Sequence, residues 1–165
     1  MSRFFKTVLL TALFVGTTDL VAAYVTQWMK TGKFAERMLH YIAGGALGWQ
    51  TSMKGGNGVA FLGLFFHYFI AFAFTLFFFL VFPRLKFLWF NKYLVGMLYG
   101  IFVAVMMSHV ILPITPLPDS PFNLSRAIIH WLTLGVVLGI PIAYNAYGYF
   151  GVDSVNERNA IKNLP

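Results

Sequence analysis

Apolar residues gather into four long runs, and short segments between them carry most of the charged residues. Each run is long enough to cross a bilayer, because ~20 helical residues span ~30 Å of hydrocarbon. The expected spans are Thr7–Met29, Val59–Phe82, Tyr93–Leu112 and Ala127–Tyr149. Since the spans use over half of the chain, we expect residues 1–165 to form a single all-α domain, a polytopic membrane protein with four transmembrane helices in a bundle.

The two connections on one side of the bundle differ in kind. Phe34–Trp49 has apolar residues at helical spacing with charged residues between them, which predicts a short interfacial or re-entrant helix between spans one and two. A flexible hinge at Lys54–Gly58 is expected to follow it. Between spans three and four, proline restricts the backbone and predicts a stiff extended crossing. The prolines of that crossing are Pro113, Pro116, Pro118 and Pro121.

Composition agrees with a membrane protein. Apolar residues make up 59% of the chain and charged residues 10%, and the mean hydropathy is +0.73, whereas soluble domains are ~45–50% apolar and ~25% charged. The net charge of +7 would suggest nucleic acid in a soluble protein. Here the Lys and Arg residues flank the spans, so the expected partner is the lipid bilayer and not nucleic acid. The absence of cysteine excludes disulfides, thiolate metal sites and Cys nucleophiles.

Charges near the spans predict an orientation. Arg3 and Lys6 precede an apolar stretch that could pass for a signal peptide, but apolar character continues to Trp28, so we expect a retained helix. The side predicted to hold both termini carries Arg3, Lys6, Arg84, Lys86, Lys92, Arg158 and Lys162. The opposite side carries Lys30, Lys33, Arg37, Lys54 and Arg126. Seven against five favours cytoplasmic termini.

Small residues mark the faces on which the helices should pack, because helices in lipid associate where their backbones approach closely. The small-residue faces are Ala12, Gly16, Asp19, Ala22, Ala23 and Thr26 in span one; Gly63, His67, Ala71 and Thr75 in span two; Gly96, Gly100, Ala104 and Ser108 in span three; and Gly135, Gly139 and Ala143 in span four. Five phenylalanines of span two lie mainly elsewhere and are expected to face lipid: Phe61, Phe65, Phe69, Phe72 and Phe79. A second copy or a membrane-complex partner would use the same small-residue faces.

Four ionisable residues within or beside the spans form the candidate site: Asp19, His67, His109 and His130. Such groups are costly in a membrane and are functional candidates by default. In the predicted topology all four lie in the half of the bundle opposite the termini, and His40 is on that side too. His109 and His130 are each one residue off their packing face. Thr18, Thr75, Thr133 and Pro141 are candidate supporting residues.

Several chemistries fit these groups. His67, Asp19 and His130 could bind a divalent metal, although no local HxxxH or ExxH pair is present. Two histidines could ligate haem, but His67 and His130 differ in expected depth. A buried Asp and His could instead exchange protons or pass a small solute, with Pro141 acting as a hinge that frees the carbonyl of Val137. The cofactor is therefore left open, with none as one alternative.

A structural role is the rival interpretation. A buried Asp that hydrogen bonds across helices can simply hold a bundle together, at ~0.6 kcal/mol per contact, which would suit a non-catalytic accessory subunit of a membrane complex. Nothing in the sequence positively indicates an enzyme, because the GxGxxG, GKS/T, GxSxG and HExxH motifs are absent. The rivals differ in geometry. Passage of a solute requires Asp19 and His67 to line one accessible cavity, whereas a scaffold would seal them.

Several short motifs carry a resemblance to a known family. They are Gly16-Thr17-Thr18-Asp19-Leu20-Val21-Ala22-Ala23, Ala43-Gly44-Gly45-Ala46-Leu47-Gly48 before Gly55-Gly56, Leu62-Gly63-Leu64 with His67, Val110-Ile111-Leu112-Pro113, and His130. Together they resemble small bacterial inner-membrane proteins of the uncharacterised YagU-like kind. The resemblance implies four helices, an inner-membrane location, a Thr-x-Asp in the first helix and a His in the second. His109 departs from that pattern, and the resemblance supplies no activity.

Overall fold

The computed structural model describes residues 2–32, 35, 37–118 and 123–153, and the regular structure within them is helical throughout. The longer helices are α1 (Arg3–Thr31), α4 (Asn57–Val81), α5 (Lys92–Met106), α6 (Leu124–Leu134) and α7 (Ile140–Phe150). The shorter elements are α2 (Met38–Leu47), α3 (Trp49–Lys54), the 3-10 turns η1 (Phe82–Arg84), η2 (Lys86–Trp89) and η4 (Leu112–Ile114), and the π-helical turns η3 (Met107–Ile111) and η5 (Gly135–Gly139).

Four helical stretches are long and apolar enough to cross a membrane: Arg3–Thr31, Asn57–Arg84, Lys92–Ile114 and Leu124–Phe150. The prediction of an all-α protein with four such helices is confirmed. Each stretch extends a few residues beyond the predicted span. At the start of α1, α5 and α6, a polar residue outside the apolar run caps the helix. Ser2, Asn91 and Asn123 each accept a hydrogen bond from a backbone amide of the first turn, which satisfies a donor that the helix itself leaves unpaired.

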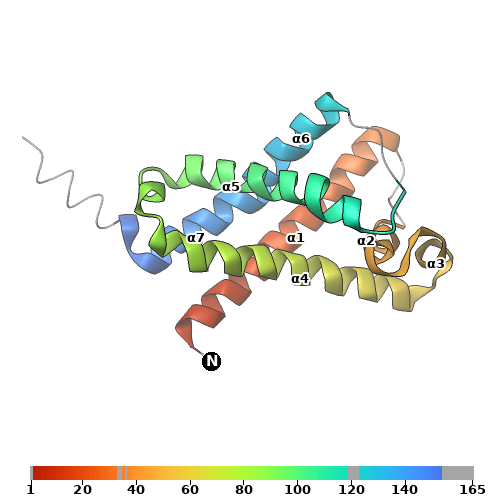
Figure 1. The fold of residues 1–165 in the computed structure, drawn as a ribbon, viewed down its shortest axis with the longest axis horizontal. Helices are drawn as coiled ribbons and strands as arrows, with labels where there is room; N and C mark the ends of the chain where they lie inside the picture. The colour runs from red at the N-terminus through yellow and green to blue at the C-terminus, as the bar shows by residue number, and fades with distance from the viewer. Residues whose placement is uncertain (1, 33–34, 36, 119–122, 154–165) are drawn as a thin grey trace, which may run out of the picture.

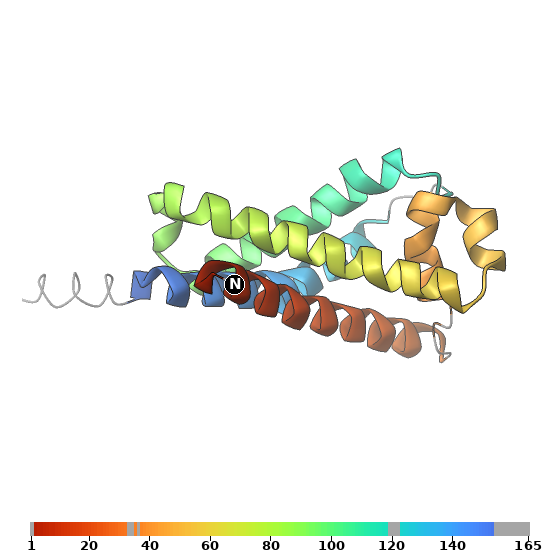
Figure 2. The same cartoon turned by 90° about the horizontal axis from the view of Figure 1, so that it is seen from below.

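The helices form two crossing pairs. In Figure 1, α4 and α5 both run lengthwise, while α1 and the α6–α7 stretch cross them diagonally. α1 packs against α4, α7 and η5, and α5 packs against α6, η5 and α7. The view turned by 90° shows α1 along one face of the bundle and α2 and α3 gathered at one end (Figure 2). The η1–η2 connection between α4 and α5 lies at the other end.

The segment between the first two spans differs from its prediction. We expected one helix over 34–49 and a hinge at Lys54–Gly58, but the described part contains two helices, α2 and α3, which meet at Gly48. Gly48 has a φ of 82°, a left-handed angle that glycine adopts without steric cost. Positions 33, 34 and 36 lie outside the described residues. α2 packs against α4, where Gly63 touches the backbone of Leu39 so closely that no Cβ would fit.

The predicted small-residue faces make the tightest helix contacts. A Cβ built on Gly96 would lie 2.5 Å from the Cα of Ile140 and 2.8 Å from the carbonyl oxygen of Gly139. A Cβ on Gly100 would likewise collide with the backbone of Gly135. α5 and the η5–α7 stretch therefore touch backbone to backbone, as the GxxxG spacing predicts.

Both π-helical turns stand at the same distance from a proline. η3 ends at Ile111, two residues before Pro113, and η5 ends at Gly139, two residues before Pro141. Proline lacks the amide that would bond the carbonyl four residues earlier, and its ring crowds that carbonyl. A local π turn is one way in which a helix accommodates this disruption.

Aromatic residues fill the end of the bundle near the α4–α5 connection, which we call the aromatic end. Phe78 lies 4.6 Å from Tyr99 and Phe82 lies 5.0 Å from Tyr147, measured between ring centroids. The Tyr99 hydroxyl donates to the carbonyl of Phe74 at 2.6 Å, and the Tyr147 hydroxyl donates to the carbonyl of Leu88. These bonds satisfy the phenols inside an otherwise apolar core.

The lipid-facing assignment of span two is correct only in part. Phe61, Phe65 and Phe69 are 71%, 61% and 57% exposed in the isolated chain. Phe72 is half-buried, and Phe79 is fully buried in the aromatic end. Phe79 departs from the prediction because α1, α4 and α7 converge at that end, where its ring contacts Phe4 of α1 and Tyr149 of α7.

Candidate functional site

The run Gly16–Asp19 of α1 lies where α1 crosses α4, and its first two residues bind that helix. The Nε2 atom of His67 lies 2.7 Å from the carbonyl oxygen of Gly16. Because a carbonyl only accepts, Nε2 carries the hydrogen and Nδ1 is the nitrogen left for other partners. Thr17 donates its single hydroxyl hydrogen to Leu13, so the Tyr68 hydroxyl, 2.8 Å away, donates to Thr17.

Thr18 reaches the opposite side of α1. Its hydroxyl lies 3.1 Å from the carbonyl oxygen of Val137 in η5, and 3.1 Å from those of Phe14 and Val15 in its own helix. The Val137 carbonyl is the one that Pro141 cannot bond, as its position four residues earlier predicts. Thr18 therefore supplies a hydrogen-bond donor from another helix, and the supporting roles expected of Thr18 and Pro141 meet at one oxygen.

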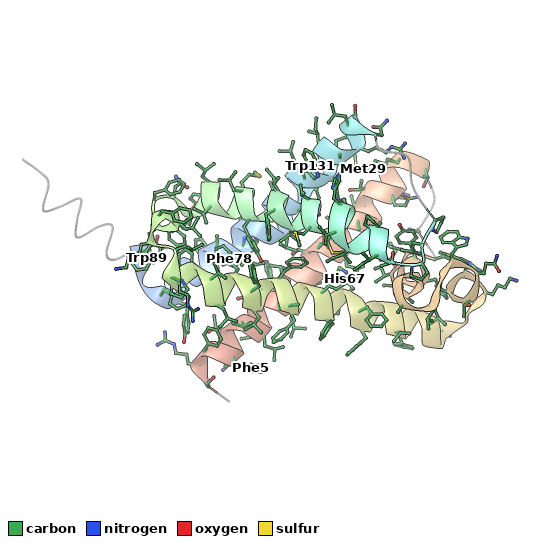
Figure 3. All side chains as sticks on the ribbon, viewed as in Figure 1. Phe5, Met29, His67, Phe78, Trp89 and Trp131 are labelled. Carbon is green, nitrogen blue, oxygen red and sulfur yellow. The ribbon has the colours of Figure 1, made fainter. Side chains whose placement is uncertain are left out.

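Asp19 faces a partly open cavity of about 330 Å³ between the helices. Asp19, His67 and His130 line it together with Tyr41 and Ser108. The remaining lining is apolar: Ile42, Ile70, Ala71, Phe74, Val103, Met107, Leu112, Leu134 and Leu138. We refer to it as the Asp19 cavity. Figure 3 shows His67 toward the α2–α3 end of α4, with Phe78 and Trp89 toward the aromatic end.

The charge balance of the cavity centres on one carboxylate. His67 and His130 are close enough to Asp19 to interact with it electrostatically. Among the residues that the structure describes, however, the Asp19 carboxylate has neither a hydrogen bond nor an ion pair. It is partly buried, and a carboxylate in apolar surroundings is costly without a neutralising partner.

The three predicted histidines of the spans have different environments. His67 is half-buried and tied to α1. His130, on α6, lines the cavity but is exposed at its rim in the isolated chain. His109 is exposed and does not line the cavity. The structure therefore brings three of the four candidate residues together and leaves His109 apart.

The remaining predicted residues lie outside the cavity. The Thr75 hydroxyl is buried and donates to the carbonyl of Ala71, and the Thr133 hydroxyl donates to the carbonyl of Ile129. Both bonds stay within one helix. His40, on α2, has Nε2 3.2 Å from the carbonyl oxygen of Gly55 and a buried Nδ1 with no hydrogen bond in the described structure.

Two polar lining residues were not among the predicted site residues. Ser108 continues the small-residue face of span three, so that spacing already contained a signal for it. Tyr41 lies beside His40 in the connection and reaches the cavity only because α2 folds onto α4. Burial raises the pKa of the Tyr41 phenol above its ordinary value of 10.0, so the group remains a neutral hydroxyl at physiological pH.

The arrangement suits protons better than metals. Across residues 2–32, 35, 37–118 and 123–153, no three His, Cys, Asp or Glu side chains are close enough to hold a metal ion. The Nε2 atom of His67 is already bonded to Gly16, which leaves only Nδ1 to act as a haem or metal ligand. A carboxylate and two imidazoles beside one cavity can, in contrast, accept and release protons.

Known proteins do not add to this picture. No protein-family model, no curated protein and no solved structure matches the chain.

Proposed function

We propose that this is a membrane protein that handles protons or a small solute through the Asp19 cavity. The observation that carries the proposal is that Asp19, His67 and His130, from α1, α4 and α6, line the same partly open cavity. Ionisable groups inside membrane proteins typically mark such pathways. Apolar walls with a few polar groups are also the usual composition of a small-molecule site.

The scaffold alternative has its own support. The bonds of Gly16, Thr17 and Thr18 join α1 to α4 and η5, as expected of residues that hold a bundle together. None of these bonds uses the Asp19 carboxylate. We therefore assign the neighbouring residues to packing and Asp19 to function.

The location that we infer is the inner membrane of a bacterium, with both termini in the cytoplasm. The resemblance to YagU-like proteins supports the membrane, and the distribution of Lys and Arg supports the orientation. Of the residues counted for that orientation, Lys33, Arg158 and Lys162 lie outside the described part of the chain. The described residues alone favour the same orientation by five to four.

Proton flux into liposomes tests the proposed function. Purified protein is reconstituted into vesicles that contain a pH-sensitive dye, and the response to a pH step is compared with that of protein-free vesicles. We expect Asp19→Asn to reduce the flux by about tenfold or more, because a neutral amide can neither carry a proton nor attract a cation. Asp153→Asn is the matched control, since Asp153 pairs with Lys92 away from the cavity.

Two results would overturn the proposal in favour of an accessory subunit. One is wild-type flux no greater than that of empty vesicles, in the presence or absence of added small solutes. The other is Asp19→Asn flux equal to that of Asp153→Asn. His67→Ala removes an imidazole that lines the cavity and should reduce the flux. His109→Ala is its control, because His109 lies outside the cavity and its loss should leave the flux unchanged.

A further inference from the structure

The Asp19 cavity combines one acidic group with apolar walls. Tyr41 and Ser108 bring hydroxyls to the lining, and His67 and His130 bring imidazoles. Asp19 is the sole acidic residue among the lining residues, and within the described helices it has no ion-pair partner. Its negative charge is therefore left to be neutralised by something that enters the cavity.

A divalent cation such as Ca²⁺ or Mg²⁺ fits this site poorly. Ca²⁺ takes six to eight oxygen ligands, and Mg²⁺ requires an octahedron of oxygen atoms. The lining offers a carboxylate and the hydroxyls of Tyr41 and Ser108 as its side-chain oxygens. A cation that arrives with its own apolar covering needs no such shell, because the cavity walls can replace water around its carbon atoms.

We propose, building on the function proposed above, that the Asp19 cavity binds a small organic cation, an amine or quaternary ammonium with an apolar body, in competition with protons. The cationic nitrogen pairs with the Asp19 carboxylate and the apolar body lies against Phe74, Leu134 and Leu138. Bound cation and bound proton each neutralise the same carboxylate, so one displaces the other.

Size and aromatic lining agree with this class of ligand. A cavity of about 330 Å³ is at the small end of the range of ligand pockets, ~300–1,000 Å³, and suits a compound of one aromatic ring. Phe74 and Tyr41 contribute aromatic rings to the wall. Aromatic faces attract quaternary ammonium groups through cation–π interactions, so a permanently charged ligand gains contacts that a hydrated metal ion does not.

The groups around the cavity determine whether cation binding strengthens or weakens with pH. α4 presents His67, α6 presents His130 and α2 presents Tyr41 to the cavity, while the lining residues from α5, η3, η4 and η5 are not ionisable. Lys30 of α1 acts electrostatically on His130. A proton bound to the Asp19 carboxylate removes the negative charge with which a cation pairs. Binding must therefore weaken as the pH falls.

Equilibrium dialysis with radiolabelled benzyltrimethylammonium, on the full chain in lipid nanodiscs, tests the inference. We expect saturable binding that weakens by about twofold or more as the pH falls from about 8 to about 4, toward the ordinary carboxyl pKa of about 3.9, because protons then compete with the ligand for the Asp19 carboxylate. Two competitors of similar shape distinguish recognition of the positive charge from burial of the apolar body. Neopentylbenzene has carbon in place of the charged nitrogen, and benzenesulfonate is an anion; neither should displace the label at concentrations at which unlabelled ligand does.

Variants and flux complete the test. Asp19→Asn should lose the saturable binding and Asp153→Asn should keep it, while size-exclusion profiles and helicity confirm that both are folded. Displacement by neopentylbenzene, binding that is unchanged by pH, or absence of saturable binding to the wild type overturns the inference. Proton flux without cation binding would overturn this inference and leave the proposed function in place. Cation binding without flux of protons or of the cation would support the proposed ligand class and contradict passage through the cavity.

Discussion

The hydroxyl of Thr18 in α1 lies 3.1 Å from the carbonyl oxygen of Val137 in η5, four residues before Pro141. This contact joins a polar residue beside Asp19 to the helical stretch that Pro141 interrupts. Thr18 of α1 thus supplies a donor to a carbonyl that lacks its usual bond from the backbone amide at position 141.

Replacing Thr18 by valine should destabilise the protein slightly. The change keeps the shape of the side chain and removes its hydroxyl, and interhelical hydrogen bonds in membranes average ~0.6 kcal/mol. Unfolding in mixed micelles of increasing SDS content measures the difference. Thr133→Val is the matched control, because its hydroxyl bonds only within its own helix. Equal losses for the two variants would contradict a contribution from the contact with Val137.

Thr18 and Pro141 should be energetically coupled. Pro141→Ala restores a backbone amide that can bond the Val137 carbonyl, so the hydroxyl of Thr18 becomes less important. In a double-mutant cycle, Thr18→Val should therefore cost less in the Pro141→Ala background, by about 0.5 kcal/mol. Additive free energies of unfolding would show that the two residues act independently.

Gly100→Ala should strongly disturb the contact between α5 and η5. An added Cβ would collide with the backbone of Gly135, and overpacking of this kind costs ~1–3 kcal/mol. Gly148 provides the control, because a Cβ there meets nothing within 4 Å. Gly148→Ala should be neutral or stabilising by up to ~1 kcal/mol, as alanine favours helix. The same SDS titration compares both, and equal stability of the two variants would refute the close contact.

The proposed orientation predicts which ends can be labelled from outside the cell. The chain has no cysteine, so single cysteines report unambiguously. Gln50→Cys, in α3, should react with a membrane-impermeant maleimide in intact cells. Phe87→Cys, at a position 70% exposed in η2, should react only after the membrane is permeabilised. The reverse pattern would place both termini outside the cytoplasm.

Sequence periodicity predicts the helices well because the membrane imposes one requirement on each. An apolar run of sufficient length is enough, and the four spans follow from it. Three helices start earlier than predicted because Ser2, Asn91 and Asn123 cap them through hydrogen bonds that hydropathy does not measure. α3 is too short and too polar for the pattern that found α2.

The sequence predicts a site residue only where its depth in the membrane and its helix face are enough to place it. Asp19 and His67 lie on small-residue faces, and such faces meet other helices. His130 and His109 were indistinguishable by that criterion, since both are one residue off their faces. The structure separates them because His130 lines the Asp19 cavity, whereas His109, within η3, does not. Tyr41 depends on the fold of α2, which no local pattern specifies.

The depth of Asp19 gives the cavity an electrical consequence. Asp19 lies about 12 residues before the end of the 29-residue helix α1, or ~18 Å along its axis. A cation that reaches it from the α2–α3 end therefore crosses roughly 0.4 of the membrane field, worth about 0.9 kcal/mol per 100 mV. The membrane voltage would therefore change how often a cation occupies the Asp19 cavity.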